Sequence, residues 1–93
     1  MAPQKNILVL ARRDHLEAMR VAAGLTIFGH QLRLVFMSRP VSEEVATSEQ
    51  AELLELSGIE PETTLQEMKG LLPVLEPQEL AQAMITADEV VNV

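Results

Sequence analysis

The chain has 93 residues, of which 47% are apolar, 2% are aromatic and none is cysteine, and its formal net charge at pH 7 is −7. This length predicts a single domain, residues 1–93, near the lower limit for an independent α/β core. The lack of cysteine excludes disulfides, thiolate metal sites and cysteine nucleophiles within the chain, and the acidic, aromatic-poor composition argues against nucleic-acid binding.

No segment of the sequence has the features of a membrane span or a signal peptide. No stretch approaches the roughly 18 apolar residues that a spanning helix needs, and the polar lead at residues 1–4 is too short for a signal peptide. We therefore expect a cytoplasmic protein that does not contact a membrane.

The first elements in chain order form a strand–helix–strand unit at residues 5–37. Asn6 to Ala11 is a continuous apolar run, the pattern of a strand that is covered on both faces. Gln31 to Met37 alternates between its two faces, as a second strand does. Because a crossover helix joins the two strands, they are expected to be parallel, with a right-handed crossover connection.

The crossover helix is predicted from Leu16 onward, where the apolar residues take helical spacing. Asp14 is the expected N-cap, Gly29 the left-handed stop, and His30 a residue of the C-terminal turn. The side chains expected to face inward are Leu16, Met19, Ala22, Ala23, Thr26 and Ile27.

A second helix is predicted after Pro40 and ends at Gly58. Its N-cap is either Ser42 or Thr47, since Thr47-x-x-Gln50 also fits a capping box. Its expected inward positions are Ala46, Leu53, Leu54 and Leu56.

The remaining segment contains one ambiguous stretch and two clear elements. Residues 59–63 are either a short third strand or the approach to a short helix that starts at a capping-box pattern, Thr64-x-x-Glu67. Pro77 opens a final helix, with Leu80, Ala83, Met84 and Ala87 on one face, and residues 89–93 form a terminal strand. The prediction is an α/β domain with a mostly parallel sheet of about four strands. Since such a sheet has two open edges, we expect a homo-oligomer.

Candidate binding residues follow the first two strands. In an open parallel sheet, ligands bind beyond the carboxyl ends of the strands. These ends carry Arg12, Arg13 and His15 after the first strand, and Ser38 and Arg39 after the second. Three guanidiniums near a helix N-terminus predict a small-anion or nucleotide site, although charged loops at this edge also serve solubility alone.

The sequence does not predict a catalytic constellation, a metal site or a cofactor. His15 could act as an acid or base only with a partner that the sequence does not identify, and no pair of His or acidic residues has a persuasive metal spacing. We predict no catalytic residues, no metal and no cofactor.

The charges are divided unevenly along the chain. Residues 1–39 hold six of the seven basic side chains and two of the 14 acids, which gives +4, whereas residues 40–93 carry −11. Two interpretations remain open: solvated helix faces in the second half, or an electropositive pocket beside an acidic docking surface.

Four motifs together resemble the DsrE/DsrF-like family, which includes the TusBCD-type sulfur-relay subunits. They are Lys5-Asn-Ile-Leu-Val-Leu, Ala18-Met-Arg-Val-Ala-Ala-Gly-Leu, Gly29-His30 with Leu32-Arg-Leu-Val-Phe-Met, and Ala87-Asp-Glu-Val-Val-Asn-Val. The resemblance implies a small three-layer, flavodoxin-like domain that assembles into trimers or hexamers and has a place in cytoplasmic sulfur trafficking. The loop that would carry the family's persulfide cysteine corresponds to part of residues 58–68 and has none.

Two functions therefore follow as expectations. The first is a non-catalytic, cysteine-free DsrE-like subunit that binds partner proteins, in sulfur relay or sulfur oxidation. The alternative is a small-anion or nucleotide-binding module that uses Arg12, Arg13 and Arg39. An enzyme with His15 as acid or base is the third and weakest hypothesis.

Overall fold

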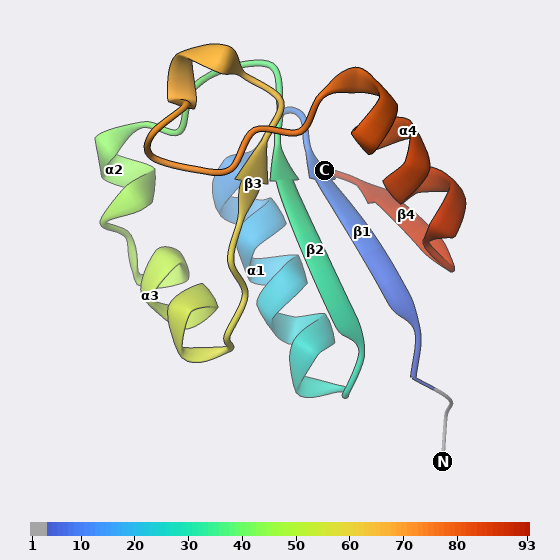
Figure 1. The fold of residues 1–93 in the computed structure, drawn as a ribbon. Coiled ribbons are helices and arrows are strands. Elements are labelled where there is room, and N and C mark those ends of the chain that lie inside the picture. The colour runs from blue at the N-terminus through green and yellow to red at the C-terminus, as the bar shows by residue number, and fades with distance from the viewer. Residues whose placement is uncertain (1–3) are drawn as a thin grey trace.

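The computed structural model describes residues 4–93 and has a four-stranded sheet at its centre (Figure 1). The strands are β1 (Asn6–Ala11), β2 (Gln31–Phe36), β3 (Glu62–Thr63) and β4 (Glu89–Asn92), in the order β3-β2-β1-β4. All three neighbouring pairs are parallel, so the predicted parallel α/β sheet is confirmed. The polar lead predicted at residues 1–4 lies, apart from Gln4, outside the described residues.

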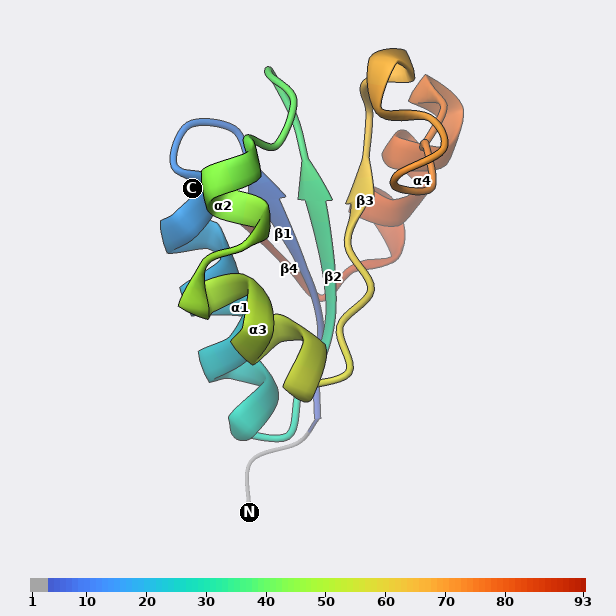
Figure 2. The same cartoon turned by 90° about the vertical axis from the view of Figure 1, so that its left-hand side faces the viewer.

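Helices cover both faces of the sheet and make three layers. Figure 2 shows α1 (His15–Ile27), α2 (Glu43–Ala46) and α3 (Glu49–Leu56) on one side, and α4 (Pro77–Thr86) on the other. A short 3₁₀ turn, η1 (Gln66–Met68), lies in the connection from β3 to α4. The fold is thus a small, flavodoxin-like, three-layer domain.

The central strands bury side chains on both faces, as the apolar run at Asn6 to Ala11 predicts. One hydrophobic cluster joins alternate residues of β1 and β2 to α1 and α3: Ile7, Val9, Ala11, Leu34, Phe36, Ala18, Met19, Ala22, Ala23 and Leu54. A second cluster lies under α4 and contains Leu8, Leu10, Val35, Leu75 and Ala83. Burial of this apolar surface is the main favourable contribution to the stability of the domain.

Helix α1 begins and ends as predicted, but its buried stripe matches the predicted one only in the middle of the helix. The Asp14 carboxylate accepts a hydrogen bond from Glu17 N at 3.0 Å, and Gly29 adopts φ +87°. Met19, Ala22 and Ala23 are buried as predicted, together with His15 and Ala18. Leu16 and Ile27, also predicted to face inward, are 40% and 74% exposed. Small side chains on the buried stripe let the helix lie close to the sheet, and a stripe that starts at His15 leaves Leu16 outside it.

The predicted second helix is in fact two short helices. Ser42 caps α2 and Ser48 caps α3 through hydrogen bonds of 3.2 Å to Val45 N and Ala51 N. The predicted capping box at Thr47 is wrong, because its hydroxyl donates back to Glu43 O at 2.9 Å.

The short length of α3 also limits what it can bury. Leu54 is 2% exposed, whereas Leu53 and Leu56 are 40% and 80% exposed, and Ala46 in α2 is exposed as well. Three of the four positions predicted to be buried are therefore exposed, since an eight-residue helix presents only about two turns to its neighbours.

The ambiguous stretch contains the short third strand. Glu62 and Thr63 pair with Val35 and Phe36. The capping box predicted at Thr64-x-x-Glu67 is wrong, because the short helix here is the 3₁₀ turn η1, whose N-cap residue Leu65 makes no side-chain cap. Thr63 is fully buried, and its hydroxyl donates to Phe36 O at 3.0 Å.

The final helix and strand lie where they were predicted. Pro77 opens α4, and a capping box joins Glu76 to Glu79. Ala83 is buried, but Met84, predicted to face inward, is 41% exposed, because α4 contacts the sheet through a narrow stripe. Within residues 4–93, no helix is both long and apolar enough to cross a membrane.

Candidate functional site

The strand order places a crevice between β1 and β4. β1 continues through α1 to β2 on one side, whereas β3 continues through α4 to β4 on the other side of β1. At such a reversal the loops beyond the carboxyl ends of the two strands diverge and leave a crevice, which is where open α/β sheets bind ligands. Here a cavity of about 410 Å³ is lined by Arg12 and Arg13 after β1, and by Asn92 and Val93 at the end of β4.

The backbone around this crevice is held in place while its charged side chains stay free of ion pairs. Arg12 N and Arg13 N both donate to Val93 O at 2.9 Å, so the loop after β1 is tied to the end of β4. Both arginines are exposed, and within residues 4–93 neither has a carboxylate oxygen within 4.0 Å. Their guanidiniums are therefore available to an external anion.

Arg39 joins these two arginines from the loop after β2. Its Nη2 donates a hydrogen bond to the backbone carbonyl of Arg13. The loop turns sharply, because Arg39 N donates to Met37 O at 2.9 Å across Ser38, which has φ +75°. Such an i→i+2 turn with positive φ is strained for a residue with a side chain. The structure thus brings Arg12, Arg13 and Arg39 to one edge of the sheet, with Ser38 at the turn between β2 and Arg39.

His15 is placed differently from the other predicted site residues. It is 3% exposed, and its ring packs edge-on against Phe36 with 4.9 Å between the ring centroids. Its Nε2 lies 3.4 Å from Met37 O. Burial lowers the pKa of His15, and the nearby charge of Arg39 lowers it further, against opposing contributions from the Met37 carbonyl and Asp14. His15 therefore packs as a neutral core histidine behind the loops and does not line the crevice.

The N-terminus of α1 adds less positive potential than the sequence predicts. Asp14 occupies the cap position, and its carboxylate accepts from Glu17 N, one of the free amide groups at this end of the helix. Asp14 is confirmed as the N-cap, and its negative charge offsets part of the helix dipole. The positive character of this edge comes from the three guanidiniums.

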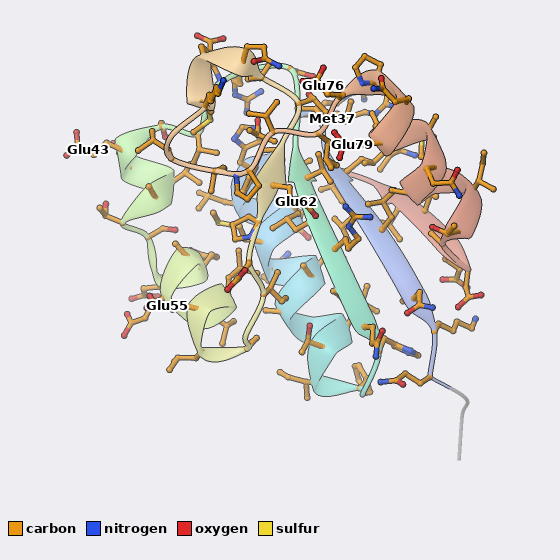
Figure 3. The ribbon with its side chains drawn as sticks, in the orientation of Figure 1. Met37, Glu43, Glu55, Glu62, Glu76 and Glu79 are labelled. Atoms are coloured by element: carbon orange, nitrogen blue, oxygen red, sulfur yellow. The ribbon has the colours of Figure 1, made fainter. Side chains whose placement is uncertain are left out.

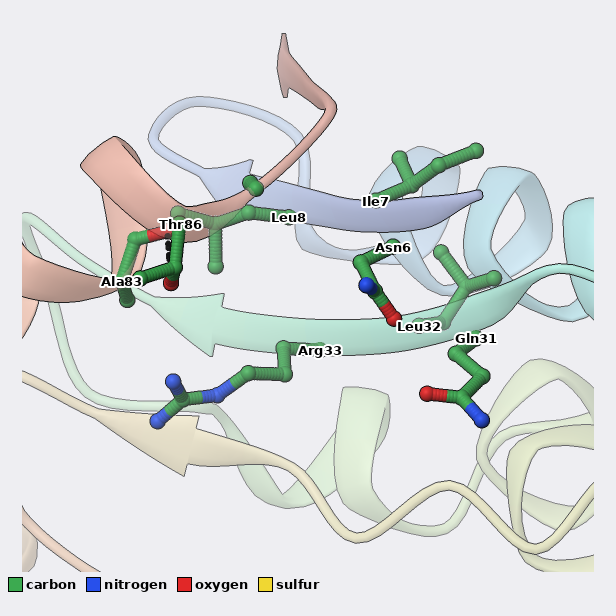
Figure 4. Close-up of a pocket in the computed structure, with 9 residues that line it drawn as sticks. Asn6, Ile7, Leu8, Gln31, Leu32, Arg33, Ala83 and Thr86 are labelled. Atoms are coloured by element: carbon green, nitrogen blue, oxygen red, sulfur yellow. Dashed lines mark hydrogen bonds between the residues drawn. The ribbon is translucent and has the colours of Figure 1, made fainter. Parts of the chain in front are cut away.

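A second cavity lies on the α4 side of the sheet, and its charge is already neutralised. It has a volume of about 240 Å³ and extends over β1 and β2 from Asn6 and Gln31 to Thr86. In Figure 4 the Arg33 side chain extends along β2 towards β3. There Nε and Nη2 of Arg33 donate to the two carboxylate oxygens of Glu62 at 3.0 and 2.9 Å, and the hydrogen bond to Glu62 raises the pKa of Arg33. This ion pair joins β2 to β3, and no unpaired charge is left for a ligand among the described residues that line the cavity.

The crevice between β1 and β4, which we call the arginine crevice, could be predicted only in part from the sequence. The arginines were predicted from their position after the first two strands, but the wall formed by Asn92 and Val93 was not, because the position of β4 beside β1 depends on the crossover through α4. The only signal for it was the β-branched segment at residues 89–93 itself.

Within residues 4–93, no group of three or more His, Asp or Glu side chains is arranged to hold a metal ion. Comparisons of the chain with family models, curated proteins and solved structures find no match in any of the three.

Proposed function

We propose that this domain binds a small, phosphate-bearing anion in the crevice between β1 and β4. The observation that carries the proposal is that Arg12 and Arg13 line the crevice and Arg39 is hydrogen-bonded to the carbonyl of Arg13. Guanidinium groups match phosphate oxygens with paired hydrogen bonds. The three arginines lie on two neighbouring loops at one edge of the sheet in a chain of net charge −7, so this edge in particular would draw an anion.

The proposed role is binding, without an assigned catalytic group. His15, the candidate acid or base, packs against Phe36 and has 3% of its surface exposed. A proton-transfer role requires hydrogen-bond reach to the substrate, which this position does not offer.

A thermal-shift experiment tests this function. Phosphate, pyrophosphate and ADP should each raise the melting temperature relative to sodium chloride at equal ionic strength, because a ligand that binds only the folded state stabilises it. The R12A/R13A double variant should lose this shift. The matched control is R20A, which removes an exposed arginine of α1 that pairs with Glu17 and lies outside the crevice. An undiminished shift in R12A/R13A would contradict the proposal.

A second candidate is a non-catalytic, oligomeric subunit of the DsrE-like type that binds proteins of a cytoplasmic sulfur relay. It is supported by the sequence resemblance and by the surface: the outer edge of β4 has no strand partner among residues 4–93, and Ile27, Phe28 and Ile85 are at least 74% exposed. Without a cysteine in residues 58–68, such a subunit would act beside a sulfur carrier.

Light scattering behind a sizing column, at two ionic strengths, tests this second candidate. A trimer or hexamer that persists in high salt supports it, because burial of apolar surface is insensitive to screening. A monomer at both ionic strengths contradicts it and leaves the anion site untouched.

A further inference from the structure

An apolar groove lies on the opposite side of the sheet from α4, between α3 and the segment that follows η1. Its volume is about 420 Å³. Met19, Phe36, Leu54 and Ile59 form its floor, and each of them is at most 9% exposed. Leu71 lies on the rim and is 78% exposed, so the apolar surface of the groove continues outward onto the face of the protein.

The rim of this groove is acidic and its charges are uncompensated. Glu55 and Glu60 line the groove, and Figure 3 shows Glu55 and Glu43 extending outward from α3 and α2. The same two helices also carry Glu44, Glu49 and Glu52. Within residues 4–93, none of these six carboxylates has a basic group within 4.0 Å. Lys69 is the single basic residue in residues 40–93.

We propose that this groove binds a basic amphipathic helix of a partner protein. An apolar groove receives the apolar face of such a helix, and lysine or arginine side chains beside that face would pair with the glutamates of α2 and α3. Beyond the two glutamates that line the cavity, α2 and α3 carry four more, which fits an elongated partner better than a small molecule held in the cavity alone.

A second copy of this chain does not offer such a segment. Its basic side chains lie on loops, strands and α1, and the apolar stripe of α1, from Ala18 to Ala23, is already buried against the sheet. The inference rests on the partner-binding function proposed above, whose partner it names by chemistry, and it is independent of the arginine crevice.

The test uses a fluorescein-labelled peptide of about 16 residues, with leucines at i, i+3, i+4 and i+7 and lysines at the flanking positions. Fluorescence anisotropy with the full chain at low salt should show saturable binding that weakens as salt is added. A peptide in which every lysine is replaced by glutamate, and one of the same composition with scrambled leucine spacing, should both bind at least about tenfold more weakly.

Two pairs of variants locate the binding. E55Q/E60Q should raise the Kd about tenfold, whereas Q78K/Q82K, which changes the net charge by the same amount on exposed positions of α4, should not raise it. L71S should raise the Kd about tenfold, whereas I85S, at a residue that is 76% exposed on α4, should leave it unchanged. All six substituted side chains are exposed, and circular dichroism verifies that each of the four variants is folded.

The outcomes separate this inference from the functions proposed above. Peptide binding that E55Q/E60Q and L71S both weaken supports the groove, whether or not the protein is oligomeric. Equal affinity for the lysine and glutamate peptides overturns it. The inference is also overturned if neither amphipathic peptide binds while a small apolar dye binds saturably and L71S weakens that binding. A salt-resistant trimer or hexamer that binds no peptide overturns the groove and leaves the subunit proposal standing.

Discussion

Arg39 donates a hydrogen bond from its guanidinium to the backbone carbonyl of Arg13, and this contact joins the loop after β2 to the loop after β1. Arg39 therefore contributes a charge to the edge of the sheet and also holds the loop from which Arg12 and Arg13 extend. Its geometric contribution depends on the planar, multi-donor guanidinium, which a lysine does not reproduce.

We predict that R39A weakens pyrophosphate binding about three- to tenfold, as expected for the loss of one charged contact and a loop constraint. R39K retains the charge, so an affinity close to that of R39A would assign the effect to the Arg13 contact. Isothermal titration calorimetry gives the Kd of each variant, with R20A as the control. If R39A binds pyrophosphate as tightly as the unmodified protein, Arg39 is not part of the site.

A second prediction concerns the pH dependence of stability at His15. Because burial lowers its pKa in the folded state, the unfolded chain binds a proton at a higher pH than the folded one. The stabilising effect of the neutral ring is complete above the unfolded-state pKa of about 6.5 and is lost as the pH falls towards the lower folded-state pKa. Urea denaturation between about pH 7.5 and 5 should therefore show a falling free energy of unfolding.

The H15L variant separates this effect from that of the carboxylates. It should flatten the part of the pH profile just below about pH 6.5, whereas H30N, at the second histidine, should keep it. His30 is used as the control because it lies beside Lys5 at the opposite end of β1 and β2 from His15. If the H15L profile runs parallel to that of the unmodified protein, His15 is not the cause of the pH dependence of the unfolding free energy.

Thr63 gives a third prediction, about the shortest strand. Its buried hydroxyl donates to Phe36 O at 3.0 Å and accepts from Leu65 N at 3.1 Å, so it fastens the two-residue β3 to the end of β2. T63V keeps the shape but removes both hydrogen bonds, and it should cost about 1–3 kcal/mol of unfolding free energy. T86V is the matched control, because the Thr86 hydroxyl lies on exposed α4 and bonds only to carbonyls of its own helix, with an expected change within about 0.5 kcal/mol. Equal costs for the two variants would contradict this assignment.

The parts of the fold that could be predicted from the sequence are those governed by local patterns. Four such features are confirmed: the apolar run of β1, the cap at Asp14, the left-handed conformation of Gly29, and Pro77 as the first residue of α4. The buried face of α1 was predicted only in part, because Met19, Ala22 and Ala23 lie on it whether His15 or Leu16 is taken as its first residue.

The predictions that failed concern features that depend on tertiary contacts. Ser48, not Thr47, caps α3, because the helix is interrupted between α2 and α3. Strand β3 is held by its pairing with β2 and by the Thr63 hydroxyl, and it has no sequence pattern of its own. For the candidate site, the arginines could be predicted from strand ends alone. The burial of His15 against Phe36 could not, because it depends on how α1 packs over β2.

The last prediction concerns the strained turn at Ser38. Its φ of +75° is unfavourable for a residue with a side chain, whereas glycine adopts it readily, so S38G should be stabilised by about 0.5–1 kcal/mol. G29A is the opposite control: its φ is +87° with open space around the added methyl group, so the substitution should destabilise by about 1 kcal/mol through backbone strain alone. Urea denaturation measures both changes. If S38G is less stable than the unmodified protein, the turn is not strained in solution; if it is more stable but binds pyrophosphate less tightly, the turn holds Arg39 in its binding position.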